Sequence, residues 1–141
     1  MAFSRHFYQD YNFAFTQCHG VIDDNSLRIH ILGFNNEAKG MTIIRELADA
    51  RKLDNAGQVT VQGLVQLSEL GNQRAAGRDG YLAIVVADPL IYEMGQLYAN
   101  LVRDLKKDTR VFFDVKEALA WLGYDGHEAD TLLAFMRKHR V

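Results

Sequence analysis

The chain has 141 residues and a mass of 16.0 kDa, which is enough for one domain built around one hydrophobic core. Sixteen Lys and Arg residues stand against 18 Asp and Glu residues, so the formal charge is -2 and the basic excess typical of nucleic-acid binding is missing. We therefore expect no nucleic-acid partner. The single cysteine, Cys18, excludes an intramolecular disulfide, which fits the reducing cytoplasm.

The N-terminal residues alternate between apolar and polar side chains, as a half-buried strand does. Phe7, Phe13 and Phe15 share one parity, and a polar turn near residues 9–12 interrupts the pattern. We expect a hairpin of residues 4–9 and 12–20. This region has no apolar stretch of the kind found in a signal peptide, and no run in the chain approaches the roughly 20 residues that a membrane-spanning helix needs.

Residues 23–36 fit both a strand and a helix. The spacing of Leu27 and Ile31 is compatible with the two-residue period of a strand and with the 3.6-residue period of a helix. Asp23 is a good N-cap, and this favours a helix. The short β-branched segment 41–47 predicts a strand, and the polar residues 49–57 predict a loop. Thr60 is expected to cap a second helix that ends near residue 77, with Val61 on its buried face.

The second half of the chain has clearer signals. The apolar run 81–87 is bounded by polar turns and predicts a strand covered on both faces. Asp88 and Pro89 are suited to begin a helix over 90–105, and a strand is expected at 109–113. Asp114 begins a helix over 115–122, and an amphipathic segment predicts a last helix at 127–139.

Familiar catalytic and metal-binding patterns are missing from the sequence. The five histidines have no His-x-x-x-His spacing, and His19 and His30 are expected to be satisfied polar residues. Cys18 lies in a strand pattern without a neighbouring base, and neither glycine-rich segment has the Gly-Lys-Ser/Thr ending of a phosphate loop. We therefore expect a protein that is not an enzyme and uses no metal or other cofactor.

Two segments carry a family resemblance: VVADPLIYEMGQLYANL at 85–101 and RVFFDVKEALAWLG at 110–123. They resemble the bacterial SpoIIAA-like proteins, small cytoplasmic relatives of the STAS domain, in their Asp-Pro turn, Arg-Val-Phe strand and Ala-Trp-Leu helix. CHGVIDDNSL at 18–27 and ELADARKLD at 46–54 are similar to earlier parts of the same family. The likeness extends over roughly residues 5–123.

The resemblance implies an α/β fold. We expect a mixed sheet of four to five strands with helices mainly on one face, in the order ββαβαβαβα plus a C-terminal helix. Residues 1–123 are expected to form a single STAS-like domain, and residues 124–141 a helical extension packed on the same domain.

The chain departs from its apparent relatives at positions that bear on function. Glu93 and Gln96 stand where relatives often have Gly and Arg. The segment RKLDNAGQVT lacks the serine that is phosphorylated in partner-switching STAS proteins, and among its residues Thr60 alone has a hydroxyl. Thr60 is therefore a phosphorylation candidate, because a phosphate is stabilised at a helix N-terminus, with a plain N-cap as the alternative.

Two functions are compatible with these observations. The first is a non-enzymatic regulatory or interaction module, whose helical face and 49–60 segment meet a protein partner. The alternative is a binding protein or sensor for a small apolar, lipid-like ligand held between the helices and the sheet. For the ligand site we expect Thr60, Asp88, Tyr92 and Glu93. A homodimer is left open, because the apolar face of helix 127–139 suits either its own core or a second copy.

Overall fold

The structure is a computed structural model that describes residues 2–74, 79–102 and 107–140. Its sheet has five strands in the spatial order β1-β2-β3-β4-β5, with β1 antiparallel to β2 and the other neighbours parallel. The strands are β1 (Phe3–Tyr8), β2 (Phe13–Asp23), β3 (Ile43–Gln58), β4 (Asp79–Val85) and β5 (Lys107–Phe112), and a 3-10 turn, η1 (Gln9–Tyr11), joins β1 to β2. The helices are α1 (Asp24–Glu37), α2 (Val61–Arg74), α3 (Pro89–Val102), α4 (Val115–Trp121) and α5 (Gly126–His139).

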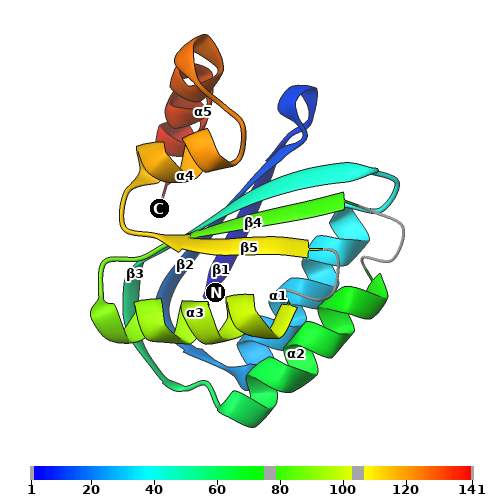
Figure 1. The fold of residues 1–141 in the computed structure, drawn as a ribbon, viewed down its shortest axis with the longest axis vertical. Helices are drawn as coiled ribbons and strands as arrows, with labels where there is room; N and C mark the ends of the chain where they lie inside the picture. Colours follow the sequence, from blue (N-terminus) through cyan, green and yellow to red (C-terminus); the bar gives the residue numbers. More distant parts are fainter. Residues whose placement is uncertain (1, 75–78, 103–106, 141) are drawn as a thin grey trace.

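Helices cover both faces of the sheet. Figure 1 shows α1, α2 and α3 together on one face, and α4 and α5 on the other. Each of the first three helices connects two parallel strands, which a parallel pair requires. The predicted element order and the mixed sheet with most helices on one face are therefore confirmed.

Successive residues of each strand point to opposite faces of the sheet, so the sheet contributes side chains to a hydrophobic core on each face. Phe13, Phe15 and Leu47 are buried against α4 and α5, in one cluster with Leu119 and Leu132. The intervening residues point toward α1, α2 and α3, where Ala14 and Ile44 pack with Phe34 of α1, and Cys18 and Ala50 belong to a further apolar cluster. Burying one large apolar side chain stabilises the fold by roughly 1.5–3 kcal/mol.

Polar caps fix the starts of two helices, as the sequence predicts. The Asp23 carboxylate accepts a 2.7 Å hydrogen bond from the backbone N–H of Ser26, and the Ser26 hydroxyl accepts one from the N–H of Asp23. These bonds settle the ambiguous segment as helix α1. Asp114 likewise accepts a hydrogen bond from the backbone N–H of Lys116 at the start of α4.

Two local predictions are wrong. Residues 49–57 are not a loop, because β3 runs without interruption to Gln58 beside β2. The register between β2 and β3 shifts near Gly20 and Val21, and these irregularities break the alternation by which a strand is recognised. Val61 is exposed, whereas Leu64, Leu67 and Ser68 are buried on α2. The expected helix ends near residues 77 and 105 lie outside the described residues.

Candidate ligand-binding cavity

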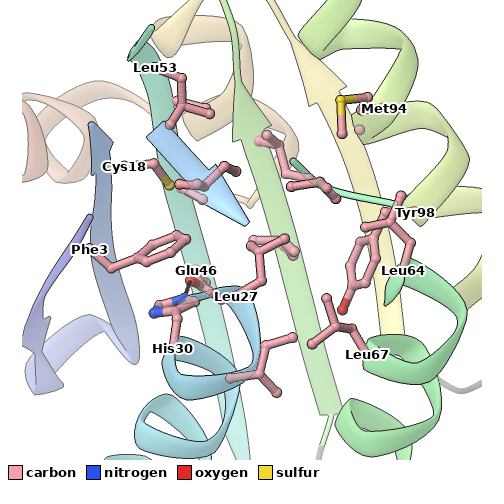
Figure 2. A pocket seen from close by; sticks show the side chains of 18 of the residues that line it. Phe3, Cys18, Leu27, His30, Glu46, Leu53, Leu64, Leu67, Met94 and Tyr98 are labelled. Carbon is pink, nitrogen blue, oxygen red and sulfur yellow. Dashed lines mark ion pairs between the residues drawn. The ribbon is translucent and has the colours of Figure 1, made fainter. Parts of the chain in front are cut away.

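A cavity of about 150 Å³ lies between the sheet and helices α1, α2 and α3. Strands β2, β3 and β4 form its floor, side chains from the three helices form its walls, and Phe3 of β1 closes one side. The lining is predominantly hydrocarbon, and Figure 2 shows part of it. The apolar side chains around the space include Phe3, Ile22, Leu27, Ile31, Phe34, Leu53, Val59, Leu64, Leu67, Leu82, Ile84, Ile91 and Met94.

Glu46 brings a carboxylate into this apolar wall. It belongs to the face of β3 that also carries Ile44 and Ala48, so the strand directs it toward the cavity, and it is 4% exposed. Its Oε2 atom accepts a 2.7 Å hydrogen bond from the Thr16 hydroxyl on β2, and Thr16 is fully buried. An ionised carboxylate in such a place needs hydrogen-bond donors, and Thr16 is one of them.

His30 of α1 lies beside Glu46, with its Nε2 atom 3.4 Å from Oε2 of that residue. On the other side of the ring, an Arg5 guanidinium nitrogen is 3.1 Å from Nδ1. Arginine can only donate, so Nδ1 must accept and the ring proton of a neutral His30 is on Nε2, facing Glu46. Phe3 stacks on the same ring at 4.5 Å between centroids. His30 is thus a satisfied polar residue, as predicted.

Tyr98 reaches into the cavity from α3, on the side away from His30 (Figure 2). Burial raises the pKa of its phenol well above the usual value, and the negative charge of Glu46 raises it further. Among the residues that the structure describes, none forms a hydrogen bond with its hydroxyl. The cavity therefore presents a neutral O–H group and a carboxylate within an apolar lining.

Cys18 also lines the cavity and is buried. Burial raises the pKa of its thiol, and the carboxylates of Glu46 and Asp49 add to the effect. Because the thiolate is the reactive form, this cysteine is chemically quiet at neutral pH. Its contribution to the cavity is that of a small apolar side chain.

Thr60 is the N-cap of α2 and lies outside the cavity lining that the structure describes. Its hydroxyl accepts a 2.9 Å hydrogen bond from the backbone N–H of Gly63 and donates one of 2.7 Å to Asp24. Asp24 also accepts the backbone N–H of Thr60. A phosphate on Thr60 would face this carboxylate, which opposes the modification electrostatically. Phosphorylation of Thr60 stays a prediction.

Asp88, Tyr92 and Glu93 are neighbours at the start of α3, yet the described lining includes none of them. Asp88 is exposed and accepts a 2.7 Å hydrogen bond from the backbone N–H of Leu90, so it caps the helix. The ring of Tyr92 stacks on Phe113, with 4.9 Å between centroids. Glu93 is exposed. The cavity does not bring the four predicted site residues together.

The residues that give the cavity its polar character, Glu46, His30 and Tyr98, are not among those predicted for the site. Glu46 had a detectable signal, because it is an acidic residue between Ile44 and Ala48 on one parity of a predicted strand. Tyr98 has no such signal, because it lies among apolar residues in the predicted helix 90–105. The pairing of His30 with Arg5 depends on tertiary structure.

The described parts of the chain contain no cluster of three or more His, Cys, Asp or Glu side chains that could hold a metal ion. Within the same residues, no helix has the length and apolar character needed to cross a membrane.

Comparison with known proteins identifies a similar fold in a solved structure. No protein-family model matches the chain, and neither does any curated protein. One similar solved structure is that of an uncharacterized protein from the DUF3478 family with a SpoIIAA-like fold, from Shewanella loihica. The two chains superpose with a TM-score of 0.57 at 17% sequence identity, over 86% of this chain and 92% of the other. The chain has a SpoIIAA-like fold.

The SpoIIAA-like fold confirms the architecture that the resemblance implied. Identity as low as 17% carries no information on activity, because one fold supports many functions. A functional argument must therefore rest on the cavity and its side chains.

Proposed function

We propose that this protein binds a small, predominantly apolar molecule in the cavity between its sheet and helices α1–α3. The observation that carries the proposal is the cavity itself, about 150 Å³ of space with a largely hydrocarbon lining and a few polar groups. Ligand sites commonly combine an apolar wall with a small number of placed polar groups. An engineered apolar cavity of similar volume in another protein binds benzene, so the expected ligand body is about one aromatic ring in size.

Ligand binding can be tested with toluene as the probe. Toluene at a concentration well above its Kd should raise the Tm, because a ligand that binds only the folded state stabilises it by mass action. Ala48→Leu places a larger side chain in the floor of the cavity and should abolish the rise. Ala120→Leu makes the same change at an exposed position on α4 and should retain it.

Either of two results would overturn the proposal: no stabilisation of the wild-type protein by toluene, or equal stabilisation of the wild type and the Ala48→Leu variant. The second result would place the bound toluene somewhere other than the cavity. Circular dichroism of both variants checks that the larger side chain leaves the fold intact.

A second candidate, a protein-interaction module without catalytic activity, has a separate observation in its favour. Apolar side chains are exposed around the edge where the parallel strands end: Val21, Val61, Leu90 and Phe113. Leu90, at 76% exposure, and Phe113, at 55%, are the most suitable contact residues, because Phe113 stacks on Tyr92 of α3, the helix that carries Leu90. Exposed apolar groups of this kind are typical of interaction surfaces when they are contiguous.

In-cell cross-linking followed by mass spectrometry tests the second candidate. A specific partner should cross-link near Lys116, which follows Phe113 closely in the chain, and should be lost from a Leu90→Ser, Phe113→Ser double variant. An unchanged cross-link pattern would contradict it. Light scattering on the wild-type protein tests the homodimer, which predicts twice the mass of one chain. Leu132 and Met136 on the apolar face of α5 are buried in the core of the same chain, so a dimer would need another surface. A cytoplasmic location also stays a prediction.

A further inference from the structure

We propose that the cavity selects small apolar molecules whose polar group is a neutral hydroxyl, an alcohol or a phenol, and rejects carboxylic acids of the same size. This inference rests on the proposed ligand-binding function and names the ligand class for that same site. It follows from the chemistry of the two polar groups on the cavity walls, Glu46 and Tyr98.

The carboxylate of Glu46 disfavours binding of a ligand that carries a carboxylate. Its Oε2 atom accepts the Thr16 hydroxyl and lies 3.4 Å from Nε2 of His30, and a hydrogen-bond donor to a carboxylate favours its ionised form. A ligand carboxylate in the same cavity would place a second negative charge beside it in a poorly solvated space. Like charges so placed repel strongly, because little water screens them.

A hydroxyl fits the groups that are present. A carboxylate oxygen accepts several hydrogen bonds, so Glu46 can accept a ligand O–H in addition to that of Thr16. Across the cavity, Tyr98 offers a neutral O–H group, which can donate to a ligand oxygen. A hydroxyl therefore suits either wall, because it can donate to the carboxylate of Glu46 or accept from the phenol of Tyr98.

An ammonium ligand matches less well than a hydroxyl. It would bring a full charge and three N–H donors into a space that is mainly hydrocarbon, and it loses much hydration energy on entry. The cavity therefore favours the neutral donor.

The test compares four molecules with the same ring: toluene, benzyl alcohol, benzoate and benzylamine. Affinities for the full chain come from calorimetric or NMR titration at pH 7. We expect benzyl alcohol to bind at least about tenfold more tightly than benzoate, which corresponds to about 1.4 kcal/mol. Benzyl alcohol should also bind more tightly than benzylamine.

Glu46→Gln tests the origin of this preference, because it removes the charge and keeps the shape. The variant should weaken benzyl alcohol binding, strengthen benzoate binding and reduce the preference between them about tenfold or more. The matched control is Glu117→Gln, the same change at an exposed position on α4, which should keep the wild-type preference. Tyr98→Phe should weaken benzyl alcohol binding several-fold and leave toluene unchanged.

The outcomes separate the two proposals. Toluene binding combined with equal affinities for benzyl alcohol and benzoate overturns the hydroxyl assignment and leaves the ligand-binding function standing. Tighter binding of benzylamine than of benzyl alcohol also overturns it, in favour of a cationic ligand. If none of the four molecules binds, both proposals are wrong. Toluene binding to the Glu46→Gln variant checks that this variant folds. If it does not fold, the affinities of the wild-type protein for benzyl alcohol and benzoate still test the proposal.

Discussion

The hydroxyl of Thr16 on β2 donates a 2.7 Å hydrogen bond to Oε2 of Glu46 on β3, and both residues are buried. In the register of the two strands, Thr16 is opposite Ala48 and Glu46 is opposite Ala14, so the bonded residues are diagonal neighbours on one face of the sheet. The polar contact lies where the sheet meets the cavity. It therefore affects both the stability of the fold and the chemistry of the site.

Removing the Thr16 hydroxyl should destabilise the protein. Thr16→Val keeps the shape of the side chain but takes a donor from a buried carboxylate, and we expect the free energy of unfolding to fall by about 1–3 kcal/mol. Urea denaturation measures the change. Thr42→Val, at an exposed position before β3, should stay within about 0.5 kcal/mol of the wild type. Equal effects at the two positions would contradict a role for the buried hydrogen bond.

Gly63→Ala should destabilise α2, although alanine in a helix is usually about 1 kcal/mol more favourable than glycine. A Cβ atom at position 63 would overlap the carboxylate of Asp24, which is held in place by its two hydrogen bonds from Thr60. Combining the change with Asp24→Ala should relieve the clash and reduce the cost of Gly63→Ala. Thermal denaturation of the four proteins in this cycle gives the coupling, and additive effects would contradict it.

The pair Asp49 and Arg51 should give the protein part of its stability above acidic pH. Burial raises the pKa of Asp49, but three hydrogen bonds from Arg51 outweigh this effect and hold the pKa below its ordinary value of 3.8. A carboxyl whose folded-state pKa is depressed stabilises the fold fully above the unfolded value. That contribution is lost as the pH falls through the folded-state pKa.

Asp49→Asn should therefore lower the free energy of unfolding by roughly 1 kcal/mol at pH 7, after allowance for the partly exposed Arg51 side chain. The difference from wild type should shrink as the pH falls below 3.8. Urea unfolding at pH 7 and in acid measures both values. Asp54→Asn removes one charge from an exposed position on the same strand and shows how much of the effect comes from charge alone.

Cys18 should resist alkylation in the folded protein. Burial, with the nearby carboxylates of Glu46 and Asp49, raises the pKa of its thiol, so almost no thiolate is present at pH 8. Iodoacetamide should add one carbamidomethyl group after unfolding in urea and almost none before, as measured by intact mass. Rapid alkylation of the native chain would show that the Cys18 side of the cavity is more accessible and more polar than the structure indicates.

The fold was more predictable from the sequence than the site. The apolar run at 81–87 and the caps Asp23 and Asp114 are local signals, and the structure places β4, α1 and α4 where they indicate. The extended strand at 49–58 was missed because its pairing with β2 is irregular around Gly20 and its outer residues are polar. A local pattern does not contain the cross-strand pairing that keeps such a segment extended.

The site depends on contacts between residues far apart in the chain. His30 contacts Arg5 on one side of its ring and Glu46 on the other, and both residues are distant from it in the sequence. Asp88 and Thr60 carry strong local signals for helix capping, and capping is what the structure shows for both. Helix-capping motifs lie near the strand ends, whereas Glu46 lies in the central strand β3 and has no such motif around it.

The measurement that tests the central claim most directly is an NMR experiment on the wild-type protein with toluene. Intermolecular nuclear Overhauser effects between the toluene ring and methyl groups report which side chains contact the bound molecule. A ligand in the cavity predicts contacts with the methyl groups of both Leu67 on α2, in the wall, and Ile84 on β4, in the floor. Contacts confined to exposed methyl groups such as those of Leu90, or no contacts at toluene saturation, would contradict the account.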